Sequence, residues 1–195
     1  SGSLNHRPQL GASNAGAMAI WVNNPANLLV GDGTNRDALL YSVYDQFDET
    51  WSAPAVAVAN VPGVIDYAFA TYGSQAAVLF LMDLDGSTAT PNDRELYYAR
   101  YTGGVWGAPV RLTTNSLIES DLALSLHTDG TPRAIWRAGN QLLFLKAWDV
   151  APAALPFAPA ALLGNLRLVD IEQGKLALLW TEPESGGQQL YAALY

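Results

Sequence analysis

The sequence contains no cysteine, and this absence excludes disulfides, thiolate catalysis and zinc–thiolate sites. Positive charge is also scarce, because Lys146 and Lys175 are the only lysines and the net charge of the 195 residues is −8. Nucleic-acid-binding proteins and proteins that dock on anionic membranes need clustered Lys and Arg. We therefore expect neither nucleic acid nor a membrane surface as a partner.

Long apolar runs are missing too. The longest apolar stretch, residues 150–163, is interrupted by three prolines, so we expect no membrane insertion. Only 14% of the residues are charged, whereas 50% are hydrophobic. That balance is typical of a folded chain with a sizeable core and not of a disordered one.

Recognisable catalytic motifs are lacking. His6 and His127 are the only histidines, no Gly-x-Ser-x-Gly motif occurs, and no glycine-rich phosphate-binding loop is present. We expect His127, which precedes a turn, to lie at the surface. The sequence gives no positive evidence for catalysis and favours a protein that is not an enzyme, with no catalytic residue assigned.

The sequence does contain an internal repeat. LLYSVY at 39–44 is followed by WSAP at 51–54, and LYYARY at 96–101 is followed by WGAP at 106–109, so that Trp51 and Trp106 lie 55 positions apart. Four short alternating strands in a period of 45 to 55 residues are typical of one blade of a β-propeller. No segment shows a sustained 3.6-residue period, so we expect almost no helix.

The repeat predicts an all-β protein, a single β-propeller domain of four-stranded antiparallel blades, with approximate blades at 4–58, 59–113, 114–163 and 164–195. The second strands carry aromatic residues that we expect to pack between blades: Trp21, Phe80, Trp136 and Trp180. The fourth strand of the third copy is degraded at 156–159, and the fourth copy ends without its Trp-containing strand. Residues 4–10, which contain Pro8, are not expected to form a convincing fourth strand for this last blade.

The incomplete last blade leaves an open strand edge, and such edges recruit partner strands. The sequence favours a fragment of a propeller of six to eight blades, or a half-propeller that pairs with another copy. A self-contained ring of four blades closed by the N-terminal residues is a third interpretation. Self-association through the open last blade is therefore expected.

Three segments carry a family resemblance: LYYARYTGGVWGAPVRLT (96–113), HTDGTPRAIW (127–136) and QLYAALY (189–195). They resemble the repeats of bacterial sialidase-like, or BNR-type, β-propellers, which often occur in large secreted or surface proteins. The resemblance implies an extracellular or cell-surface location and a glycan or protein ligand. The Ser-x-Asp-x-Gly-x-x-Trp box of true sialidases is absent, and no arginine triad can be assigned. Sialidase activity is therefore not implied.

The resemblance also implies where a ligand would bind. In such propellers the first strand of each blade lines a central channel and starts on the ligand-binding face. Asp66 and Asp121, 55 positions apart, begin two of these strands. The equivalent places are held by His6 or Arg7 in the first copy and by residues 165–167 in the fourth copy. This ring of polar groups could bind a cation or sugar hydroxyls, or supply the two carboxylates of glycoside hydrolysis. Alternatively, each Asp bonds only to nearby backbone.

Two long loops, 23–37 and 83–94, would open on the same face, and function tends to concentrate in such loops. Each contains an Asp-Gly pair and closes near an arginine, so we include Arg36 and Arg94 among the candidate ligand-binding residues. Asp83 and Asp85 resemble the opening of a calcium loop, although the distal Glu is missing. We treat both as candidate metal ligands, with a solvated acidic turn as the alternative. No other cofactor is expected.

Three functional hypotheses follow. The preferred one is a non-catalytic propeller module that binds glycan or protein through its loop face. The second is part of a glycoside hydrolase-like propeller with carboxylates at the channel mouth. The third is a purely structural repeat scaffold.

Overall fold

The computed structural model describes residues 2–13, 16–155, 164–171 and 175–194, which form four antiparallel sheets. The expected all-β architecture is confirmed. The one helical segment in the described ranges is a 3₁₀ turn, η1, at Pro91–Asp93. None of the described helices is long and apolar enough to span a bilayer. The strands are, in sheet 1, β1 Leu4–Ser13, β2 Gly16–Asn24, β3 Asp37–Asp45, β4 Thr50–Trp51 and β5 Ala55–Val61; in sheet 2, β6 Val64–Tyr72, β7 Gln75–Asp83, β8 Arg94–Thr102, β9 Val105–Trp106 and β10 Val110–Arg111; in sheet 3, β11 Glu119–Leu126, β12 Pro132–Ala138, β13 Gln141–Leu145 and β14 Ala153–Ala154; and in sheet 4, β15 Gly164–Ile171, β16 Lys175–Glu184 and β17 Gly187–Leu194.

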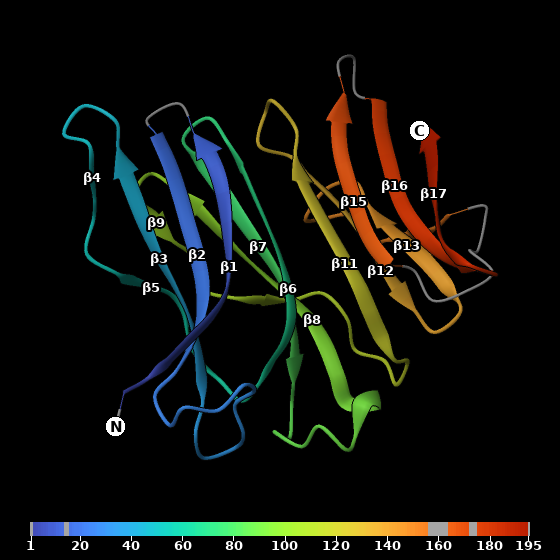
Figure 1. Ribbon diagram of the computed structural model, residues 1–195, viewed down its shortest axis with the longest axis horizontal. Helices are drawn as coiled ribbons and strands as arrows, with labels where there is room; N and C mark the ends of the chain where they lie inside the picture. The colour runs from blue at the N-terminus through green and yellow to red at the C-terminus, as the bar shows by residue number, and fades with distance from the viewer. Residues whose placement is uncertain (1, 14–15, 156–163, 172–174, 195) are drawn as a thin grey trace.

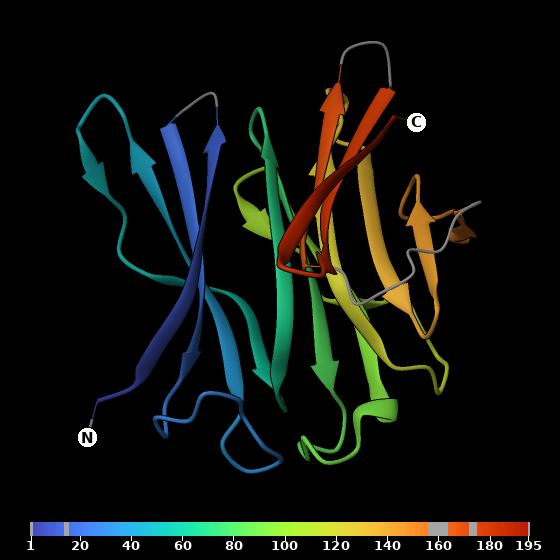
Figure 2. The same ribbon diagram turned by 45° about the vertical axis from the view of Figure 1, so that its right-hand side comes forward.

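Each sheet is a meander whose first strand lies innermost. The inner strands β1, β6, β11 and β15 contact one another in that order, and β1, β11 and β15 point the same way in the centre of the molecule (Figure 1). The later strands of each sheet lie progressively outward (Figure 2). All inner strands therefore begin at the same end of the molecule, which also holds the β2–β3 and β7–β8 loops.

The first strand of sheet 1 includes residues 4–10, which the sequence did not favour as a closing strand for the last blade. They belong to β1, which pairs with β2 throughout, from Leu4 opposite Asn24 to Ser13 opposite Gly16. Pro8 is accommodated because the register shifts between His6 and Gln9, where Arg7 adopts a positive φ of 52°. A proline without an N–H donor is tolerated at such a bulge. Because β1 pairs with its own sheet, the described structure does not support a ring closed by N-terminal residues pairing with the last strand.

The outermost strands also differ from the expectation of one continuous strand. In sheet 1, β4 and β5 both pair with β3 and are separated by residues 52–54. In sheet 2, β9 and β10 pair with β8 on either side of residues 107–109. Each break coincides with the Ala-Pro that follows the repeat tryptophan, since proline cannot donate to the ladder. In sheet 3 the fourth strand is Ala153–Ala154, and residues 156–159 lie outside the described ranges.

Three apolar clusters fill the spaces between successive sheets. As expected, Phe80, Trp136 and Trp180 are buried in these clusters. Trp21 holds the equivalent place in sheet 1 but is only half-buried, because no described sheet covers that face. Its indole Nε1 instead donates to Asn5 Oδ1 at 2.9 Å. The same alternation that buries one side of sheet 4 leaves apolar side chains exposed on the other.

Candidate ligand site at the channel mouth

The candidate site lies where the four inner strands begin. Every inner strand has a register irregularity there: between His6 and Gln9, between Val64 and Asp66, between Ser120 and Ala123, and between Gly164 and Arg167. A bulge re-aims the side chains beside it. The repeated bulge therefore turns a polar residue of each sheet toward a common region at the mouth of the channel.

The channel itself is a cavity of about 340 Å³ lined by all four inner strands, including Gln9, Tyr67, Leu124 and Arg167. Gln9 joins β1 to β6, because its Nε2 donates to Tyr67 O at 2.7 Å and its Oε1 accepts from Phe69 N at 3.0 Å. The hydroxyl of Tyr67 contacts the carbonyl oxygens of Arg7 and Ile20. Burial raises the pKa of Tyr67, so the hydroxyl keeps its proton and acts as a donor. These contacts make the wall between β1 and β6 rigid.

Asp66 is the exposed carboxyl of the mouth. Its Oδ1 accepts from the N–H of Tyr67 at 2.8 Å, and among the described residues no cationic group lies within ion-pair distance of it. Burial by the surrounding channel walls raises its pKa. Attraction by Arg7 and Arg167 opposes this shift, and repulsion by Asp121 adds to it. Asp66 is exposed at the surface, but the surrounding protein still weakens the solvation of its carboxylate.

The sequence-predicted ring is therefore brought together, since Arg7, Asp121 and Arg167 all act electrostatically on Asp66. The other members of the ring are already engaged. The Arg7 guanidinium donates to the carbonyls of Val64 and Ile65. Asp121 Oδ2 lies 3.0 Å from Arg137 Nε and also accepts from Ser120. Asp66 is consequently the most accessible acceptor of the set.

Arg137 is a partner that sequence reasoning missed. It lies on β12 and is paired in register with Ser120, the neighbour of Asp121. The hairpin turn at residues 127–131 sets that register, so a strand-pairing argument could have found it. The buried guanidinium of Arg137, only 8% exposed, neutralises Asp121.

The two long loops lie at the same end (Figure 1) and touch each other through their Asp-Gly turns. A Cβ on Gly86, whose φ is +73°, would lie 2.4 Å from Gly33 N and 2.7 Å from Asp32 C. Only glycine permits this approach. The contact between the two loops therefore requires the glycine at position 86.

Of the two candidate loop arginines, Arg36 donates to Asn60 O at 3.0 Å. Arg94 lies 3.3 Å from Asp83 Oδ2 and also donates to Thr88 O. Neither contributes to the electrostatics of Asp66. Arg94 therefore belongs to the acidic loop, residues 83–94, whereas Arg36 contacts β5, the outer strand of sheet 1.

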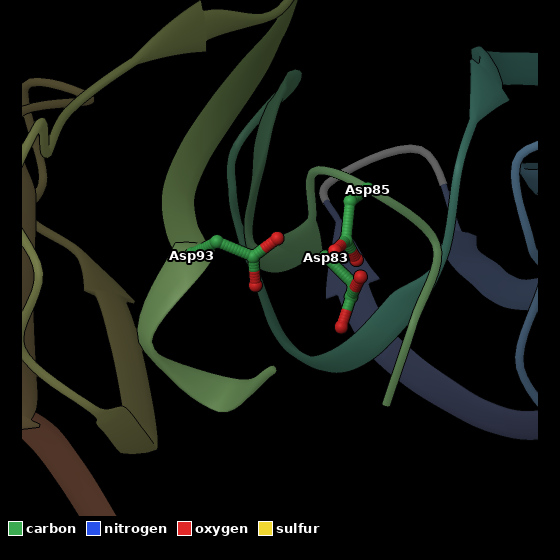
Figure 3. Close-up of side chains that lie close together, drawn as sticks. All are labelled: Asp83, Asp85 and Asp93. Atoms are coloured by element: carbon green, nitrogen blue, oxygen red, sulfur yellow. The ribbon is translucent and has the colours of Figure 1, made fainter. Parts of the chain in front are cut away.

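The acidic loop brings three carboxylates together. One oxygen from each of Asp83, Asp85 and Asp93 lies within 4.8 Å of the others, and Figure 3 shows Asp83 and Asp85 side by side with Asp93 reaching toward them. Burial raises the pKa of Asp83, whereas the hydrogen bond from Ser87 N lowers the pKa of Asp85. Oxygen ligands of this kind suit Ca²⁺. These three residues are the ones that could hold a cation in the described part of the chain.

His127 corrects the expectation of a surface histidine. It is half-buried, and its Nδ1 lies 2.6 Å from Asp170 Oδ2 on β15. The contact joins sheets 3 and 4 at the end of the channel away from the mouth. His127 therefore has a structural partner and no place in the candidate site.

Comparisons with known proteins support the fold. No family model and no curated protein matches the sequence. Among solved structures, the Hadza microbial sialidase Hz136 is similar with a TM-score of 0.63 and 16% identity, over 97% of this chain and 44% of that one. Trypanosoma rangeli sialidase gives 0.60 and 12%, over 98% and 36%. Zg3597, a family 117 glycoside hydrolase of Zobellia galactanivorans, gives 0.62 and 8%, over 98% and 66%.

The chain thus spans less than half the length of the two sialidases. At these identities the similarity concerns the fold alone. The four sheets match part of a sialidase-like β-propeller, as the repeat resemblance implied.

Proposed function

We propose that this chain is part of a β-propeller module that binds carbohydrate at the channel mouth without cleaving it. The observation that carries the proposal is Asp66, an accessible carboxyl that contacts a backbone N–H and no described cation. Carboxylates flanked by guanidinium groups bind sugar hydroxyls well, because one partner accepts and the other donates. Arg167 supplies such a donor, since it is exposed, lines the channel cavity and attracts Asp66 electrostatically.

The non-catalytic assignment follows from the state of the second carboxylate. Glycoside hydrolysis commonly uses two carboxyl groups, one as acid and one as base or nucleophile. Asp121 Oδ2 accepts hydrogen bonds from Arg137 and Ser120. This oxygen is therefore occupied by structural contacts and does not serve as the second catalytic carboxylate. Binding requires only Asp66 and its neighbours.

The test is a glycan-binding screen of the 195-residue chain, followed by titration of any hit by calorimetry. Asp66→Asn should weaken binding about tenfold or more, since hydrogen bonds to charged groups contribute roughly 1.5–3 kcal/mol. Asp48→Asn is the matched control, because Asp48 is an exposed aspartate in the turn after β3. If no glycan binds, or if Asp66→Asn binds as the wild type does, the proposal fails. Capture of a protein ligand by the same face would favour the protein-binding version of the module.

A second candidate function rests on the raised pKa of Asp66. A carboxyl that keeps its proton to higher pH can act as the general acid in glycoside hydrolysis. The test is release of 4-nitrophenolate from a panel of aryl glycosides. Turnover that is lost in Asp66→Asn would replace the binding proposal with an enzymatic one.

A further inference from the structure

A second concave site lies between sheets 2 and 3, at the end of the molecule away from the mouth. The cavity measures about 450 Å³ and combines residues of β8, the β11–β12 turn and the segment after β13. Its volume falls in the range of small-molecule sites, roughly 300–1,000 Å³. It shares no lining residue with the channel cavity.

The site has an aromatic floor. The rings of Tyr98 and Trp148 are stacked with centroids 3.9 Å apart and an interplanar angle of 16°. Both side chains are half-buried and line the cavity. Stacking holds each ring in one orientation, so the floor presents a fixed apolar surface to a ligand.

Polar groups surround this floor. Arg100 and Asp149 are exposed, and in the described part of the chain neither side chain forms an ion pair or a hydrogen bond. Asp129 accepts from Thr131 N at 2.8 Å through Oδ1. The hydrogen bonds from Thr131 lower the pKa of Asp129, so this carboxyl is ionised at neutral pH. Arg100 and Asp149 therefore line the cavity as a donor and an acceptor without protein partners, while Asp129 adds a charged acceptor that Thr131 holds in place.

The walls are preformed. A Cβ on Gly130, whose φ is +80°, would lie 2.1 Å from Gln75 Oε1, so the side chain of Gln75 at the start of β7 packs on the β11–β12 turn. Arg133 Nη1 donates to Lys146 O at 2.6 Å and positions the segment that carries Trp148. A cavity held in shape on both sides requires little ordering when a ligand binds.

We propose that this cavity binds one ring of a neutral saccharide. The apolar face of a sugar ring packs on aromatic side chains, while its hydroxyl groups pair with carboxylates and guanidinium groups. The lining carries Arg100 against Asp129 and Asp149, a formal charge of −1. This charge repels acidic sugars, and therefore the ligand class is a neutral hexose or pentose.

The experiment follows the indole N–H resonance of Trp148 in the intact 195-residue chain by NMR, assigned with Trp148→Phe. The probes are the methyl glycosides of glucose, galactose, mannose and xylose, with glucuronic acid as the anionic counterpart. Asp149→Asn and Arg100→Gln test the polar rim, and Asp48→Asn is the matched control. Asp66→Asn separates this site from the channel mouth.

We expect at least one neutral glycoside to shift the Trp148 resonance saturably. Both rim variants should weaken that binding about tenfold, as expected for loss of a hydrogen bond to a charged group, whereas Asp48→Asn and Asp66→Asn should leave it unchanged. The proposal is overturned if no neutral glycoside shifts the resonance. It is equally overturned if the rim variants bind like the wild type, or if glucuronic acid binds more tightly than the neutral sugars.

Discussion

The carboxylate of Asp37 accepts a hydrogen bond of 2.8 Å from the backbone N–H of Val64, so the start of β3 fixes the start of the next sheet. The same Oδ2 accepts from Gly31 N at 2.9 Å, and Oδ1 accepts from Asn24 Nδ2 at 2.8 Å. Asp37 is 1% exposed. One buried side chain thus ties the β2–β3 loop, the sheet 1 hairpin and the inner strand of sheet 2 together.

Replacing Asp37 with Ala should lower the free energy of unfolding by about 3 kcal/mol or more. The substitution leaves the buried N–H groups of Gly31 and Val64 without an acceptor and removes one of the two hydrogen bonds of Asn24 Nδ2. Each unsatisfied buried group costs about 1–3 kcal/mol. Chemical denaturation monitored by tryptophan fluorescence measures the loss. Asp48→Ala, in an exposed turn, should change stability by no more than about 0.5 kcal/mol. Equal effects of the two substitutions would show that the buried network does not stabilise the fold.

The repeat aromatics should differ in their contribution to stability. Trp136 is fully buried between sheets 2 and 3, so Trp136→Ala should destabilise the chain by about 3–5 kcal/mol. Trp21 occupies the same repeat position on a face that no described sheet covers, and Trp21→Ala should cost clearly less. Thermal denaturation of the two variants gives the comparison. A Trp136→Ala variant with near-native stability would remove Trp136 from the core.

The sequence was sufficient to predict the architecture because the same pattern of strands recurs in each copy of the repeat. Trp51 and Trp106 marked equivalent outer strands, and the alternating runs marked the inner ones. It was insufficient for β1, since the strand depends on a bulge at Arg7 and Pro8 that local propensity opposes. Tertiary pairing with β2 overrides that local preference.

The candidate site was predictable only in part. The equal spacing of Asp66 and Asp121 predicts equivalent places for the two residues, and each lies at the register shift near the start of its inner strand. Their different environments depend on cross-strand contacts, and Arg137 neutralises only Asp121. The second cavity has no repeat signature at all. It forms where Tyr98 of one sheet meets Trp148 of the next, and such contacts appear only in three dimensions.

Asp66 should make the protein less stable as the pH rises. Its pKa is raised in the folded chain, so the folded state holds the proton to a higher pH than the unfolded state does. Stability from this group is therefore present below the ordinary Asp pKa, about 4, and is lost as the pH rises through the raised value. Asp66→Asn removes this dependence. Its melting temperature should exceed that of the wild type at pH 7, with a smaller difference at pH 4. A difference that is independent of pH would contradict the raised pKa.

Calcium should raise the melting temperature if the acidic loop binds it. The carboxylates of Asp83, Asp85 and Asp93 converge, and a ligand that binds only the folded state stabilises that state in proportion to the logarithm of its concentration. Asp85→Asn should abolish the rise. This exposed residue is preferable to Asp83, whose loss would also break the contact with Arg94. Magnesium at equal concentration is the control, since it prefers to keep its waters. No shift at millimolar calcium would identify the loop as a solvated acidic turn.

Sheet 4 presents an apolar face through which the chain should associate. Within β17, Tyr191 and Ala193 pack toward sheet 3, so alternation turns Leu190 and Leu194 to the opposite face, where they are 67% and 75% exposed.

Among the described residues, no strand pairs with the outer edge of β17, and β17 carries no charged side chain or proline to blunt that edge. We therefore propose that a second copy of this chain covers the face, packing on it as each sheet packs on the next. The half-buried Trp21 on the open face of sheet 1 offers the matching surface, because Phe80, Trp136 and Trp180 make that contact at the other junctions.

Multi-angle light scattering should show a mass above 20.9 kDa that rises with concentration. Leu190→Lys and Trp21→Lys should each return the chain to a monomer by placing a charge in the contact, whereas Leu29→Lys, at an exposed leucine of the β2–β3 loop, should not. A wild-type chain that stays monomeric at high concentration would show that this face does not mediate self-association.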